Sequence, residues 1–230
     1  MIASGDLGNR GRRAELERAK GLLDRLPAPA LAVPGNHDMP YTPVARATRP
    51  WEVFEGVFGT TDPVYRSENA VVCGLNSARP WRHQGGRLGP DRLRRAAQVL
   101  AGGPSGALRV VVCHHHLAGA PWRASRKCPL KHRDAVLRAL ADAGAELVLG
   151  GHIHQGSTAE RHAFEALPDD ERSPLVVATA PGYGRPRPQR LGEANGLNVV
   201  RWSSSEVEVE TRIWRDGAFA ATAFSRFYRV

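Results

Sequence analysis

The most informative stretch of the chain is Ala30-Leu31-Ala32-Val33-Pro34-Gly35-Asn36-His37-Asp38. Its four apolar residues are followed at once by Pro34-Gly35, which is typical of a short buried strand that ends in a loop. Residues 12–26 carry apolar side chains at helical spacing among charged ones, so a helix is expected before this strand. The stretch therefore indicates a helix, a strand and a polar loop in that order.

The same unit recurs twice further along the chain. Helices are expected at about 89–101 and 130–143, and the strands that follow them run from Leu108 to Cys113 and from Glu146 to Leu149. Polar residues come directly after each strand. Three such units predict an α/β fold with a largely parallel, buried sheet and helices outside it.

Further strands are expected around these units. Their positions are 64–66, 71–75, 175–179, 197–202 and 207–213. In the last of them apolar and charged residues alternate, which predicts a half-buried antiparallel strand. The sequence has no internal repeat and no segment long enough for a linker between domains. We therefore expect residues 1–230 to form a single domain.

Composition narrows the class of protein. The chain has 230 residues, of which 42% are apolar and 24% charged, as in folded globular proteins. The sequence lacks both a membrane-spanning apolar stretch and a signal peptide, so we expect a cytoplasmic protein without membrane contact. Three cysteines without C-x-x-C spacing do not suggest a thiolate zinc site. Oligomeric state stays open.

The net charge of +9 favours polyanionic partners such as phosphorylated metabolites or nucleic acid. Almost all of the positive charge is arginine spread along the chain, and no short basic run of the kind that binds nucleic acid occurs. Nucleic acid is therefore a partner that the sequence allows without favouring it.

Polar clusters fall at the ends of the expected strands. They are Gly5-Asp6, Gly35-Asn36-His37-Asp38, His114-His115-His116 and Gly151-His152-Ile153-His154. Taken singly, such residues are more often turn residues or surface histidines than ligands. Ligands bind outside the carboxyl ends of strands in α/β sheets, and carboxylate, amide and imidazole donors together suit Mn, Fe or Zn. The four clusters jointly predict a metal site with nitrogen and oxygen ligands.

These clusters, in this order, resemble the calcineurin-like metallophosphoesterase family, whose pattern is D-x-H, G-D, G-N-H-D/E, H and G-H-x-H. The resemblance is greatest to the bacterial branch that includes cyclic-nucleotide phosphodiesterases. It implies a four-layer α/β/β/α sandwich that holds two divalent metal ions, Mn, Fe or Zn. The implied metal ligands of this chain are Asp6, Asn36, His114, His152 and His154.

The resemblance also implies a role for each residue. Asp6 would bridge the two ions. The other ligands of one ion would be Asn36, His114 and His152, and His154 would be a ligand of the second ion. His114 is preferred to His115 because family members place this ligand at the first residue after the apolar strand.

Two further residues would be catalytic. His37 resembles the histidine that faces the substrate phosphate and assists the leaving oxygen, and Asp38 would orient its imidazole ring.

The family's D-x-H element has no counterpart before Gly5. We therefore expect a chain that lacks the first strand of the fold, through truncation at its N-terminus, and a second metal site that is incomplete. Whether such a chain is active is left open.

The resemblance implies a phosphodiesterase that hydrolyses a cyclic nucleotide or a similar small diester with a metal-bound hydroxide. Two alternatives are a DNA-repair-type nuclease of the same family and a non-catalytic scaffold with a degenerate metal site.

Overall fold

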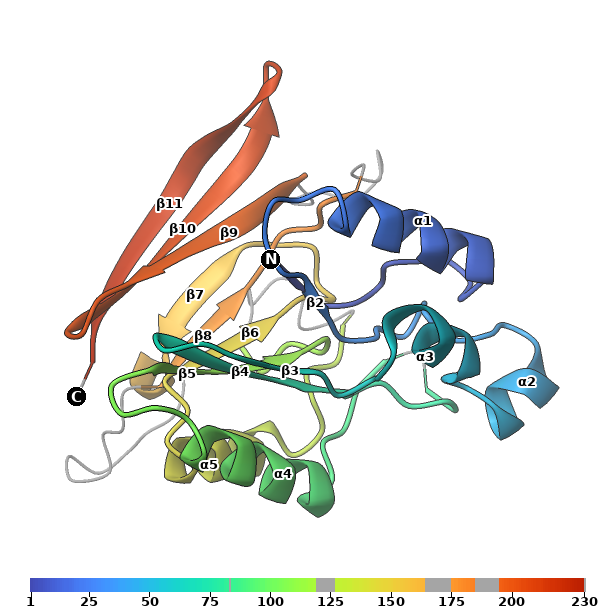
Figure 1. Ribbon diagram of the computed structural model, residues 1–230, viewed down its shortest axis with the longest axis horizontal. Helices are drawn as coiled ribbons and strands as arrows, with labels where there is room; N and C mark the ends of the chain where they lie inside the picture. Colours follow the sequence, from blue (N-terminus) through green and yellow to red (C-terminus); the bar gives the residue numbers. More distant parts are fainter. Residues whose placement is uncertain (83, 119–126, 164–174, 185–194, 230) are drawn as a thin grey trace.

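The structure is a computed structural model that describes residues 1–82, 84–118, 127–163, 175–184 and 195–229 (Figure 1). Its helices are α1 (Arg13–Leu23), α2 (Pro43–Thr48), α3 (Glu52–Phe58), α4 (Pro90–Ala101) and α5 (Arg133–Asp142), with a 3₁₀ turn at Arg161–Ala163. Its strands are β1 (Ile2–Ala3), β2 (Leu31–Ala32), β3 (Val64–Arg66), β4 (Ala70–Leu75), β5 (Leu108–Cys113), β6 (Leu147–Gly150), β7 (Ser157–Glu160), β8 (Val176–Thr179), β9 (Gly196–Trp202), β10 (Glu206–Arg215) and β11 (Ala218–Tyr228).

The main sheet has six strands in the order β3-β4-β5-β6-β8-β7. The four central strands are parallel, while β3 and β7 pair antiparallel at the two edges. The helix-then-strand units seen in the sequence supply α4 with β5 and α5 with β6. The expectation of a largely parallel, buried sheet is therefore confirmed.

Alternate residues of each central strand face opposite sides of this sheet. On β4, Val71, Cys73 and Leu75 belong to the core that packs against α4 and α5. Ala70 and Val72 belong to a second core on the other side. Because both faces are covered, these strands are apolar along most of their length.

A second layer of strands covers the other side of the main sheet. It consists of the parallel pair β1-β2 and the antiparallel sheet β11-β10-β9. Leu31 of β2 and Val209 of β10 share one core with Val110 of the main sheet. A third core, around the buried Leu16 and Phe54, packs α1 and α3 against β1 and β2.

The layers thus run from α4 and α5 through the main sheet and the second strand layer to α1 and α3 (Figure 1). This order confirms the α/β class and the α/β/β/α sandwich. Within the described ranges, no helix is long and apolar enough to cross a lipid bilayer.

Candidate metal centre

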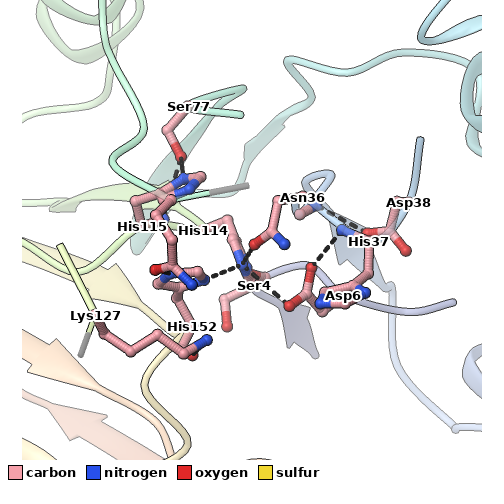
Figure 2. A network of polar contacts seen from close by, with 12 residues as sticks. Ser4, Asp6, Asn36, His37, Asp38, Ser77, His114, His115, Lys127 and His152 are labelled. Atoms are coloured by element: carbon pink, nitrogen blue, oxygen red, sulfur yellow. Dashed lines mark hydrogen bonds and ion pairs between the residues drawn. The ribbon is translucent and has the colours of Figure 1, made fainter. Parts of the chain in front are cut away.

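Four polar side chains meet where strands of the two layers end (Figure 2). Asp6 and Asn36 follow the parallel neighbours β1 and β2, and His114 and His152 follow the parallel neighbours β5 and β6. Parallel neighbours bring the residues after them to the same edge of a sheet. Each strand layer therefore contributes two of the four side chains.

Three of these side chains lie around the Nε2 atom of the fourth, His114. This nitrogen lies 3.3 Å from Asp6 Oδ2, 3.2 Å from Asn36 Oδ1 and 3.1 Å from His152 Nδ1. The ligand atoms of Asp6, His114 and His152 all lie within 4.8 Å of one another. Atoms bound to one ion at about 2.1 Å lie roughly 3.0–3.4 Å apart around it. The spacing therefore fits a single ion bound between these side chains.

Hydrogen bonds on the outer side of each ring determine which nitrogen faces inward. His114 Nδ1 lies 2.7 Å from the carbonyl oxygen of Ser4, and His152 Nε2 lies 3.1 Å from Gln84 Oε1. Oxygens of this kind only accept, so these two nitrogens carry the hydrogens. The inward nitrogens, His114 Nε2 and His152 Nδ1, then present lone pairs to each other and to two oxygens. Such a group of lone pairs can bind a cation placed among them.

Electrostatics favour the protonation states of Asp6 and His152 that can bind a metal. Burial works to raise the pKa of Asp6, but the His114 ring and the His37 residue together outweigh it and hold that pKa well below its usual value. Burial, together with His114 and His115, holds the pKa of His152 far below its usual range. Asp6 is therefore charged and His152 neutral at neutral pH. Burial alone would lower the pKa of His114, but Asp6 raises it overall.

Close approach of the backbone brings Asp6 into the site. Gly5 has φ +94°, and a Cβ there would lie 2.7 Å from both Gly35 N and His114 Nδ1. A Cβ at Gly35 would overlap the Asp6 backbone nitrogen and its Oδ1 atom. Asp6 itself has φ +58°, a left-handed conformation that is uncommon for residues other than glycine. Gly5 therefore leaves room for the Asn36 loop, and Gly35 leaves room for the Asp6 loop.

The expectation that Asp38 orients the His37 ring is wrong. Its two oxygens accept the backbone N–H groups of Gly8 at 2.7 Å and of Gly35 at 2.8 Å. His37 Nδ1 lies instead 3.0 Å from the carbonyl oxygen of Asn9. Asp38 is fully buried between the Asp6 loop and the Asn36 loop. Buried N–H groups of both loops need acceptors, and the Asp38 carboxylate accepts from them. A backbone carbonyl therefore orients the His37 ring in this chain.

The environment of Asp38 is unfavourable for its charge. Burial and the nearby Asp6 carboxylate raise the pKa of Asp38 to about 6, although the N–H donors of Gly35 and Gly8 act in the opposite direction. Asp38 therefore joins the Asp6 loop to the Asn36 loop at some electrostatic cost.

An Asp38→Ala variant is expected to lower the free energy of unfolding by about 2 kcal/mol or more, because each buried N–H left unpaired costs about 1–3 kcal/mol. Relief of the repulsion from Asp6 offsets part of this loss. Urea denaturation at pH 7.5 measures it, with the exposed Asp134→Ala on α5 as the control. Equal stability of the two variants would show that Asp38 does not hold the loops together.

His154 lies outside the group formed by Asp6, His114 and His152. Its ring packs beside Gly182, where a Cβ would lie 3.0 Å from His154 Nδ1. His115 also points elsewhere, with Nδ1 2.9 Å from Ser77 Oγ. Of the residues proposed as ligands from the sequence, the structure therefore brings Asp6, Asn36, His114 and His152 together, and places His154 apart from them.

Three contributors to the site have no signal in the sequence. These are the Ser4 carbonyl, the Gln84 amide and Lys127, whose Nζ donates to the carbonyl oxygen of His152 at 3.0 Å. A backbone carbonyl has no residue signature. Gln84 and Lys127 lie far from His152 along the chain and belong to no motif.

Comparison with known proteins agrees with this geometry. A family model described as calcineurin-like phosphoesterase matches residues 1–156. A protein of Synechococcus sp., named "Probable cyclic nucleotide phosphodiesterase", is 31% identical over 156 residues, which are 67% of this chain and 57% of that protein. This chain thus matches little more than half the length of that relative.

Solved structures resemble the fold more distantly. A Vps29 mutant from Entamoeba histolytica is 12% identical with a TM-score of 0.48, covering 99% of this chain and 80% of that one. A predicted phosphoesterase from Streptococcus pneumoniae is 12% identical with a TM-score of 0.44, covering 99% and 95%. Neither likeness bears on function. The family model, which spans more than half of the chain, shows that this protein belongs to the calcineurin-like phosphoesterase family.

Proposed function

We propose that the chain is a metal-dependent phosphodiesterase that hydrolyses a cyclic nucleotide or a similar small diester. The observation that carries this proposal is the convergence of Asp6, Asn36, His114 and His152 on one point, with lone pairs turned inward. Family membership gives the reaction class, and the Synechococcus relative suggests the substrate class. The same proposal treats residues 1–230 as one domain, which the core shared by Leu31 and Val209 supports.

In this mechanism the four converging side chains hold one divalent ion, which is Mn, Fe or Zn by its donor set. When bound, such an ion polarises a phosphate oxygen and activates water as the nucleophile. Asp6 supplies the negative charge that the site needs, and the neutral ring of His152 would bind without adding positive charge. Among the described residues, the side chains that could hold a metal form one such group. We therefore propose one firmly held ion, with His154 left to an incomplete second site.

His37 is proposed to exchange a proton with the leaving oxygen. Its backbone N–H donates to Asp6 Oδ1 at 3.0 Å, so the residue is fixed beside the metal ligands (Figure 2). Its Nδ1 faces the carbonyl oxygen of Asn9 at 3.0 Å and the Tyr41 hydroxyl at 3.2 Å. Nδ1 therefore donates to the Asn9 oxygen, and Nε2 is the nitrogen left for proton exchange with the substrate.

The test is hydrolysis of 3′,5′-cyclic AMP and of bis(p-nitrophenyl) phosphate with added Mn²⁺. We expect turnover that EDTA abolishes and Mn²⁺ restores, and a loss of roughly 100-fold or more in His152→Ala, because catalysis by the ion depends on its fixed ligands. Activity that survives both EDTA and His152→Ala would overturn the proposal. Turnover of single-stranded DNA alone would instead favour the nuclease alternative, to which the charge of +9 is suited.

A further inference from the structure

Gln84 connects an outer loop to one of the proposed metal ligands. It lies between β4 and α4, and its Oε1 atom is 3.1 Å from His152 Nε2. Two hydrogen bonds hold the loop on the C-terminal side of Gln84. The N–H of Arg87 donates to the carbonyl oxygen of Ser77 at 2.8 Å, and the N–H of Lys131 donates to that of Gly86 at 2.8 Å. The segment that follows Gln84 is thus held by contacts that do not involve the proposed metal ligands.

Apart from Gln84, the contacts of His152 hold its ring in place. They do not determine which ring nitrogen carries the hydrogen. Lys127 Nζ donates to the His152 carbonyl oxygen at 3.0 Å, and the His116 ring stacks on the His152 ring with centroids 6.0 Å apart. His152 is also almost fully buried, at 3% exposure. None of these contacts distinguishes a hydrogen on Nδ1 from a hydrogen on Nε2.

Two neutral tautomers of His152 compete at this position. With its hydrogen on Nδ1, His152 would donate to the lone pair of His114 Nε2, 3.1 Å away. That hydrogen bond would occupy both nitrogens that an ion needs. With its hydrogen on Nε2, the ring donates to Gln84 Oε1 and its Nδ1 lone pair faces the site. The Gln84 oxygen is the acceptor that favours the second arrangement.

We propose that Gln84 is a positioning residue for metal binding: it accepts the Nε2–H of His152 and thereby holds this ring in the tautomer that can bind an ion. The inference rests on the proposed metal site but not on the identity of the substrate. Outer hydrogen-bond partners of metal-binding histidines commonly change metal affinity by 10–100-fold. Gln84 is exposed, so its contribution comes from this acceptor and not from filling the core.

The first experiment measures the dissociation constant for Zn²⁺ in a chelator competition assay at pH 7.5. It compares the wild-type chain with Gln84→Ala, Gln84→Glu and the control Gln98→Ala, an exposed glutamine on α4. We expect about 10–100-fold weaker binding in Gln84→Ala. Gln84→Glu keeps an acceptor and should bind Zn²⁺ at least as tightly as the wild type. Gln98→Ala should not differ from it.

The second experiment reads the tautomer directly in the metal-free chain. Long-range ¹H–¹⁵N spectra of protein labelled with ¹⁵N at histidine distinguish a protonated ring nitrogen from an unprotonated one. We expect the Nε2–H form of His152 in the wild type and in Gln84→Glu, and a shift toward the Nδ1–H form in Gln84→Ala. A residue that only supported the loop would leave these signals unchanged.

Unchanged Zn²⁺ affinity in Gln84→Ala, or an equal loss in Gln84→Glu, would overturn the inference. If the wild type binds no Zn²⁺, the proposed metal site fails, and the metal-free spectra still decide whether Gln84 sets the tautomer of His152. If binding responds to Gln84 as expected while no diester is hydrolysed, the inference stands and the proposed activity fails.

Discussion

A His114→Ala variant should lose divalent metal binding by roughly 100-fold or more, because loss of an outer partner alone costs 10–100-fold and His114 is proposed as a direct ligand. Its Nε2 atom is the point from which the oxygens of Asp6 and Asn36 lie 3.3 Å and 3.2 Å away. Without this nitrogen, the three remaining side chains lose the donor that lies within 3.3 Å of each of them. Zn²⁺ titration of the metal-free protein measures the change.

The matched control for this variant is His162→Ala, since the His162 ring is exposed and pairs with Glu160 away from the site. It should bind Zn²⁺ as the wild type does. Circular dichroism establishes that both variants are folded, which matters because His114 is 1% exposed. A folded His114→Ala protein that binds Zn²⁺ with wild-type affinity would remove His114 from the ligand set, and with it the proposed centre.

Gly35→Ala should disturb both stability and metal binding. The added methyl group would overlap the Asp6 backbone nitrogen and Oδ1, and would lie 2.8 Å from Asp6 Cγ. The Gly5-Asp6 loop must therefore move away, which takes the carboxylate out of the group of ligands. Overpacking of this kind typically costs about 1–3 kcal/mol, so we expect a loss of that size together with much weaker Zn²⁺ binding. Urea denaturation and Zn²⁺ titration measure the two effects.

Gly21→Ala provides the opposite case. Gly21 lies on α1, and a Cβ there would meet no atom within 4 Å. Alanine in a helix is favoured over glycine by about 0.5–1 kcal/mol, so this variant should be slightly more stable and bind Zn²⁺ normally. If Gly35→Ala were as stable as Gly21→Ala and bound the ion equally well, the close contact between the two loops would not be required.

Much of the site could be predicted from the sequence because its residues follow buried strands. His114 comes directly after the apolar strand Leu108–Cys113, and parallel strands deliver their following residues to one edge. The pairing of β5 with β6 therefore brings His114 close to His152 without any further information. Nearly continuous apolar runs predicted these strands, because both faces of the main sheet are buried.

The remaining features depend on contacts between distant parts of the chain. The acceptor role of Gln84 arises from the packing of a loop 68 positions before His152, and one of the two partners of Asp38, Gly8, lies in the Asp6 loop. Strand β11 went unpredicted for another reason. Most of its side chains are exposed and many are small, so no apolar alternation marks it. β1 is only two residues long and gives no periodic signal.

Three residues with left-handed backbone, two in the metal centre and His154 beside it in sequence, affect which substitutions the fold tolerates. Asp6, His152 and His154 have φ of +58°, +69° and +58°, values that glycine adopts without steric cost. Mutation to glycine at these positions would relax the backbone while deleting a functional group. Once selection for metal chemistry ceases, replacement by glycine is therefore a favoured route of decay. Glycine at these positions in a relative would be a sign of lost catalysis even where the fold is intact.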